Sequence, residues 1–155
     1  MVSTQQYNKN NKTLLPKIKI EQNRMIATTL YKRYRELTEI KQEQLNQLSE
    51  FIFGMFDLDN VCIYFSGKQP HRKSNKKLKM KTLGKHISYG KNGDIATIQI
   101  YKFTAVKKKI VSPKTAIDIL IHEIMHNLDI RLLKLNSIHC KGFYARIKQL
   151  KDMLK

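Results

Sequence analysis

Two histidines four residues apart, His122 and His126, enclose Glu123 in the pattern H-E-x-x-H. The surrounding apolar residues recur at helical spacing, and residues four apart on a helix lie on one face, about one turn apart. Both imidazoles can therefore bind one metal ion, while Glu123 can reach a water bound to that ion. A catalytic zinc site has three protein ligands and keeps a fourth position for water. The metal lowers the pKa of that water, and a neighbouring carboxylate accepts its proton.

The third ligand is sought downstream, where Asp129, His139 and Cys140 are the candidates. Asp129 lies on the same helix, and one straight helix spreads three ligands over too much of its length to surround a zinc ion. We expect Asp129 either to orient a ligand imidazole through its free ring nitrogen or to form a salt bridge with a Lys or Arg. His139 follows a break at residues 135–137 that lets the chain turn back. Cys140 would favour a closed, structural site, so His139 ranks ahead of it.

Two helices must hold these ligands. Ser112 and Pro113 are typical of a helix start, with Ser at the N-cap and Pro at the first helical position. The helix predicted from residue 114 to about 134 has a core-facing stripe, formed by Ile117, Leu120, Ile121, Ile124 and Leu128. A second amphipathic helix follows His139, and its apolar face carries Phe143, Ile147, Leu150 and Leu154. This closing helix is expected to pack beside the metal helix and to hold His139 in place.

The preceding chain supplies a sheet and its cover. Residues 61–65 predict a strand, in which Cys62 is expected to be a small buried residue. Residues 85–89 and 95–103 predict a hairpin with an Asn-Gly turn between them. Helical periodicity runs from about residue 21 to 56, as one helix or two, and predicts a cover for one sheet face. Residues 1–20 are interpreted as a basic flexible tail, and residues 21–155 as a single domain.

The net charge of the chain indicates which classes of partner it would bind. The 155 residues include 30 Lys and Arg against 12 Asp and Glu, a formal net charge of +18. Such a balance favours polyanions, DNA or RNA first and an anionic membrane surface second. The two cysteines are too few for a disulfide scaffold, and no apolar run is long enough to span a bilayer. We therefore expect an intracellular, cytoplasmic protein and no membrane protease.

The densest basic stretch lies between the first strand and the hairpin. From residue 68 to 85 there are eight Lys and Arg, no acidic residue and several turn-forming residues, which predicts a basic loop. Phosphate contacts by such residues are the usual basis of sequence-independent DNA or RNA binding. The candidate nucleic-acid-binding residues are Lys68, Arg72, Lys73, Lys76, Lys77, Lys79 and Lys81. Residues 107–109 form a second, smaller basic patch.

The segment from His122 to Phe143 resembles the SprT-like (Spartan-type) zinc metallopeptidases: H-E-x-x-H, then His139 thirteen positions on, then Phe143. Residues 139–146 are similar to a compact bacterial branch, and the resemblance covers roughly residues 60–150. It implies a gluzincin-like minimal fold, with His122, His126 and His139 as zinc ligands and Glu123 as general base. It also implies a link to proteins that degrade DNA-crosslinked protein.

The chain departs from the pattern of that family at two positions. Members commonly have Gly after the third histidine and an acidic residue two positions later, where this chain has Cys140 and Gly142. No further cysteines follow that could form the C-terminal zinc ribbon of some members. The basic loop would then have to supply any contact with nucleic acid.

Together these features predict an α+β zincin-like domain with N-terminal helices, a short three-stranded sheet, the metal helix and a closing helix. The expected activity is hydrolysis of polypeptides with one Zn2+, with Tyr144 and Tyr101 as candidates to stabilise the oxyanion. The substrate is expected to add as a strand along the edge of residues 95–103. The alternative is a non-catalytic DNA- or RNA-binding protein whose structural zinc has Cys140 as its fourth ligand.

Overall fold

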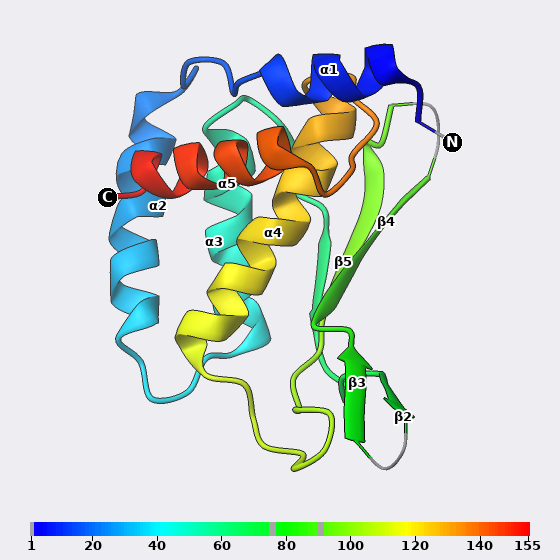
Figure 1. Cartoon of the computed structure of the whole chain (residues 1–155). Helices are drawn as coiled ribbons and strands as arrows, with labels where there is room; N and C mark the ends of the chain where they lie inside the picture. Colours follow the sequence, from blue (N-terminus) through cyan, green and yellow to red (C-terminus); the bar gives the residue numbers. More distant parts are fainter. Residues whose placement is uncertain (1, 75–76, 90–91) are drawn as a thin grey trace.

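The computed structural model describes residues 2–74, 77–89 and 92–155, and it has an α+β fold as predicted (Figure 1). Its elements in chain order are α1 (Thr4–Lys12), α2 (Glu21–Arg35), α3 (Gln42–Gly54), β1 (Cys62–Phe65), β2 (His71–Ser74), β3 (Lys77–Lys81), β4 (Gly84–Tyr89), β5 (Ile95–Ile100), α4 (Pro113–Arg131) and α5 (Lys141–Met153). The periodic segment from residue 21 to 56 is therefore two helices rather than one.

The main sheet has three strands in the order β1-β5-β4, so β5 lies in the centre. β1 runs parallel to β5, and β4 runs antiparallel to it, which confirms the predicted strand at residues 61–65 and the predicted hairpin. Alternate side chains point to opposite faces of a strand. Ile98 and Ile100 are fully buried on one face, whereas Tyr64 and Tyr89 are exposed. One face of the sheet is thus the core face.

The helices cover that core face. α3 packs on β1, α4 packs across β4 and β5, and α2 packs against α3 and α4. In Figure 1, α5 crosses one end of this layer with α1 beside it. The predicted core-facing stripe of α4 is confirmed, because its five residues, Ile117, Leu120, Ile121, Ile124 and Leu128, are all fully buried. No helix in the described part of the chain has both the length and the apolar run needed to cross a membrane.

The N-terminal segment differs from the flexible tail predicted for residues 1–20. It forms α1, which begins with a capping box in which Ser3 and Gln6 each accept a hydrogen bond from the other's backbone N–H. α1 packs on α5, Asn10 is 1% exposed, and Leu15 joins the core. The sequence did not indicate this docking because hydrophobic periodicity detects apolar faces, and the buried residue of α1 is an asparagine.

The basic stretch also differs from the prediction of a loop. β2 and β3 form an antiparallel two-stranded sheet, with His71 paired to Lys81 and Ser74 to Lys77. Backbone hydrogen bonds between two strands do not require apolar side chains, so the lysine-rich composition concealed the hairpin. Lys68 and Lys81 are exposed. Lys76 and the side chains of the other candidates, Arg72, Lys73, Lys77 and Lys79, lie outside the described residues.

The prediction that Cys62 is buried is wrong. Cys62 is exposed, as is Tyr64, while Ile63 and Phe65 point into the core. The alternation of side chains along β1 decides this, since inward placement of the two larger apolar residues puts Cys62 on the opposite face.

Candidate metal centre

α4 presents the first two histidines as the H-E-x-x-H spacing predicts. The helix begins at Ser112, whose side chain accepts a hydrogen bond from the Thr115 backbone N–H, with Pro113 as its first residue. His122 and His126 lie one turn apart, with ring centroids separated by 5.1 Å. Both side chains are half-buried rather than free in solvent.

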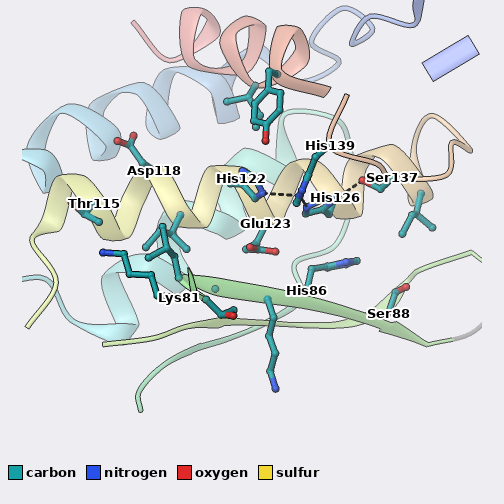
Figure 2. A pocket seen from close by; sticks show the side chains of 18 of the residues that line it. Lys81, His86, Ser88, Thr115, Asp118, His122, Glu123, His126, Ser137 and His139 are labelled. Atoms are coloured by element: carbon teal, nitrogen blue, oxygen red, sulfur yellow. Dashed lines mark hydrogen bonds between the residues drawn. The ribbon is translucent and has the colours of Figure 1, made fainter. Parts of the chain in front are cut away.

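The third histidine reaches this pair from the connection between α4 and α5 (Figure 2). The Nε2 atom of His139 lies 3.2 Å from Nε2 of His122 and 2.9 Å from Nε2 of His126. One ligand nitrogen from each residue falls within a group whose members all lie within 4.8 Å of one another. The sequence-based choice of these three residues as a cluster is therefore matched by their placement.

The donor set fits a zinc ion. Imidazole nitrogens bind zinc at about 2.0–2.1 Å, which places two tetrahedral ligands about 3.3 Å apart. Two of the Nε2 distances in this cluster are close to that value. Neutral imidazoles whose unprotonated nitrogens face one another repel, and a divalent cation between them would turn that repulsion into binding. These are the residues that could hold a metal.

The ring of His126 is oriented from behind. Its Nδ1 lies 2.6 Å from the Ser137 hydroxyl, and that hydroxyl donates to Oδ2 of Asp129 over 3.1 Å. Because Ser137 uses its proton on Asp129, it accepts from Nδ1–H of His126, which leaves Nε2 free as a ligand atom. Asp129 therefore acts on the imidazole through Ser137, not by the direct contact that the sequence suggested.

Asp129 is also half of a buried ion pair, so both sequence-based alternatives for it hold in part. Arg146 of α5 donates from Nε to Oδ1 at 2.8 Å and from Nη2 to Oδ2 at 2.9 Å. Both side chains are fully buried. Burial raises the pKa of the Asp129 carboxyl, while the hydrogen bonds from Arg146 and Ser137 act in the opposite direction.

Glu123 points from α4 into the cleft between this helix and β4 (Figure 2). The residue is only 6% exposed, and burial raises the pKa of its carboxyl to about 7. A carboxyl group with a pKa near neutrality can both accept and release a proton at physiological pH. Its position beside the three imidazoles makes it the candidate proton carrier.

The cleft has a volume of about 920 Å³ and runs between α4 and the edge strand β4. On the β4 side, His86 faces the cleft, and its Nε2 accepts a hydrogen bond from Nδ2 of Asn127 at 3.0 Å. Burial lowers the pKa of His86 to about 4 and, with the neighbouring histidines, that of His126 to about 3. Both rings are therefore neutral at pH 7, as a metal ligand or a hydrogen-bond acceptor requires.

β4 can lie this close to α4 because residue 84 is a glycine. A Cβ atom at Gly84 would lie 2.6 Å from Cγ2 of Ile119 and 2.9 Å from the backbone oxygen of Gln99. Both distances are shorter than real Cβ contacts, so any larger side chain would push the strand away from the helix.

The two tyrosines proposed to stabilise the oxyanion, Tyr144 and Tyr101, differ in their position relative to the cleft. Tyr144 lines the cleft, and its ring centroid lies 6.4 Å from that of His122 and 6.3 Å from that of His139. Tyr101 is not among the described residues that line the cleft. Of these two tyrosines, Tyr144 is therefore the one that lies at the cleft.

Cys140 does not join the histidine cluster. It is 5% exposed, and its Sγ donates to Oδ1 of Asn10 at 2.9 Å. The backbone of Cys140 is the N-cap of α5, which turns its side chain towards α1 and away from the cleft. The closed site that a cysteine ligand would make is not formed by the described residues.

The segment predicted to be the free edge for substrate addition, residues 95–103, is not an edge of the sheet. β5 is the central strand, and both of its edges are already paired. β4 is the strand that combines a sheet edge with a place in the cleft wall. The prediction was wrong because a hairpin has two strands, and its sequence does not say which of them will pair with β1 and which will remain at the edge of the sheet.

Sequence reasoning missed several residues that hold the site, namely Asn10, His86, Ser137 and Arg146. Arg146 did give a signal, since it lies three residues after Phe143 and four before Leu150, on the apolar face of α5. A charge on such a face needs a buried partner, and Asp129 was available. Asn10 gave no such signal.

Comparisons of the chain with known protein families, curated proteins and solved structures find no match.

Proposed function

We propose that the chain is a zinc-dependent metallopeptidase of the SprT-like kind, with a zincin-like fold and one Zn2+ held by His122, His126 and His139. The observation that carries the proposal is the convergence of three Nε2 atoms beside a buried carboxylate at the wall of a long cleft. Three imidazoles leave a fourth position open, which is the ligand number of catalytic rather than structural zinc.

The chemistry that zinc supplies in such a site is Lewis acidity, which polarises a carbonyl and makes water acidic near neutral pH. Glu123 takes a proton from the attacking water as the water oxygen bonds to the scissile carbonyl carbon. The same carboxyl then gives that proton to the departing amide nitrogen as the C–N bond breaks. A pKa of about 7 suits both halves of this transfer. Tyr144 is the candidate donor to the carbonyl oxygen.

The substrate is a polypeptide that lies extended between α4 and β4. An edge strand offers backbone N–H and C=O groups for pairing with such a chain. Gly84, His86 and Ser88 line the cleft along β4, and their small or neutral side chains leave room for it. The substrate would thus become the next strand after β4, in place of the addition to residues 95–103 that the sequence suggested.

The basic surface supports an association with DNA or RNA. Lys81 ends β3 and also lines the cleft, while Lys68 and the patch of residues 107–109 are exposed. A nucleic acid bound by such cations would bring the proteins attached to it close to the cleft. A non-catalytic nucleic-acid-binding protein with a closed zinc site is the less favoured alternative, because Cys140 faces α1.

The decisive experiment compares the zinc-loaded chain with Glu123→Gln on a protein substrate, with and without bound DNA or RNA. We expect the variant to keep its zinc and to lose about 10²- to 10⁴-fold in hydrolysis rate, the usual contribution of a general base. Glu50→Gln on the exposed side of α3 is the matched control and should cleave normally. The proposal would be refuted if Glu123→Gln cleaved as fast as Glu50→Gln, or if the zinc-loaded wild type cleaved no substrate.

A further inference from the structure

α1 is docked in an unusual way, because almost nothing apolar holds it. Of its nine residues only Asn10 is buried, and the side chains that fix it are polar. A helix of this length is not stable alone in water. Its docking must therefore come from the specific contacts of Asn10 and its neighbours.

Asn10 bonds to both sides of His139. Its Nδ2 donates to the backbone oxygen of Asn136 at 2.5 Å, and its Oδ1 accepts from Sγ of Cys140 at 2.9 Å. Asn136 and Cys140 enclose the short connection that carries the third histidine. One side chain from the other end of the chain thus fixes the path of that connection.

Arg146 links α1 to the other ligands. Its guanidinium donates to the backbone oxygens of Asn10 and Thr13 at 2.6 and 2.9 Å and to Oδ1 of Asn10 at 2.7 Å. Its remaining bonds go to Asp129, which leads through Ser137 to Nδ1 of His126. If α1 left, Arg146 would lose these three hydrogen bonds to Asn10 and Thr13 while keeping its pair with Asp129.

The fit between α1 and α5 depends on Gly142. A Cβ atom there would lie 2.3 Å from the backbone oxygen of Asn10 and 2.6 Å from Cα of Asn11. The Gly142 N–H also donates to Oδ1 of Asn11 at 2.8 Å. Cys140 and Gly142 are the two positions at which this chain departs from the SprT-like pattern, and both contact α1.

We infer that α1 is a clamp for the third metal ligand, with Asn10 as a positioning residue that holds His139 against His122 and His126. The inference rests on the metal centre of the proposed function but not on peptide hydrolysis. Metal affinity then depends on the docked fraction of α1, and a bound metal in turn stabilises the docked helix.

The first test measures Zn2+ affinity of the full chain by competition with a chromophoric chelator. Asn10→Ala should bind Zn2+ about 10- to 100-fold more weakly, the loss usual when a ligand's support is removed. Asn8→Ala, an exposed asparagine of the same helix, is the matched control and should stay within about twofold of wild type. Wild-type affinity in Asn10→Ala would overturn the inference.

Repeating Asn10→Ala in a chain that already carries His139→Ala distinguishes a role in positioning His139 from a general loss of structure. In His139→Ala the clamp has no ligand to position, so adding Asn10→Ala should lower the affinity of the remaining pair by less than about threefold. Equal losses in the two backgrounds would overturn the inference. Gly142→Ala, which drives α1 off α5 without altering Asn10, should weaken binding as Asn10→Ala does.

The unaltered chain provides a test that needs no variant to fold. Zn2+ should slow hydrogen exchange of the α1 amides, since coupling between two sites is reciprocal. Unchanged exchange in α1 would overturn the inference while leaving the proposed function intact. Zinc-dependent slowing without peptide cleavage would instead leave the clamp standing and remove the peptidase. A wild-type chain that binds no Zn2+ removes both.

Discussion

The two walls of the cleft are built in opposite ways. The helical wall comprises His122, Glu123 and His126 of α4 with Ser137 and His139, and the strand wall comprises Gly84, His86 and Ser88 of β4. On the helical wall His126 is hydrogen-bonded to Ser137, Ser137 donates to Asp129, and Asp129 accepts from Arg146, which is fully buried. On the strand wall the one comparable bond of a described side chain joins His86 to Asn127.

Under the proposed function, the difference separates two requirements of one site. Metal ligands must be held to a fraction of an ångström, and this demands locked rings and a satisfied hydrogen-bond network behind them. A substrate chain needs space and free backbone groups, which an edge strand with small side chains offers. Changes behind the helical wall should therefore alter stability and metal affinity, whereas changes on the strand wall should leave metal affinity alone.

The largest effect is expected from the foundation of the helical wall. Arg146→Met leaves Asp129 buried without its cation, which should lower the free energy of unfolding by about 3–5 kcal/mol. Urea unfolding followed by circular dichroism measures this. Lys148→Met on the exposed face of α5 is the control and should change stability by less than about 0.5 kcal/mol. A loss below about 1 kcal/mol in Arg146→Met would show that the ion pair does not support the wall.

A smaller effect contrasts one serine from each wall. Ser137→Ala removes the acceptor that orients His126 and should weaken Zn2+ binding about 10- to 100-fold. Ser88→Ala changes a serine that lines the same cleft from β4 and should leave the affinity unchanged. Competition with a chelator measures both. Similar losses in the two variants would contradict the division between the walls.

The smallest effect is the pH dependence of the metal-free protein. Burial lowers the pKa of His86 to about 4 and of His126 to about 3, and it also lowers that of His122. Below about pH 6.5 the unfolded chain therefore binds more protons at these residues than the folded chain, so stability falls as the pH falls. Glu123, with its pKa raised to about 7, opposes this between about pH 4.5 and 7 but offsets only one histidine.

Urea unfolding in the presence of EDTA at pH 7, 6 and 5 should therefore show a progressive loss of stability. The loss is expected to be modest because the histidine side chains are partly exposed and solvent screens part of the cost. His86→Phe should make the free energy of unfolding less dependent on pH, because it removes the contribution of the histidine on the strand wall. Stability that rises towards pH 5 would contradict the neutral state of these rings in the folded protein.

Much of the site could be predicted from local pattern. The spacing of His122 and His126 follows from the helical period, and Ser112-Pro113 marks the start of the helix that carries them. His139 was ranked over Cys140 by the chemistry of an open site, and the structure places it with the other two. The buried stripe of α4 and the strands β1, β4 and β5 follow from periodicity in the same way.

What failed was whatever depends on distant parts of the chain. α1 appeared to be a tail because its one buried residue is polar, and its bonds reach residues about 130 positions away in the sequence. The basic loop proved to be a hairpin because strand pairing is made by the backbone. The substrate edge was assigned to β5 because strand order is not written in the strands themselves.

The sequence alone therefore determined which atoms could bind a metal and which carboxylate could serve them, since both follow from side-chain chemistry and the period of one helix. The tertiary structure alone decided which buried groups hold those atoms in place and which strand faces them. The physical reason is that a buried polar group is stable only when distant parts of the chain complete its hydrogen bonds, and only folding brings those partners together.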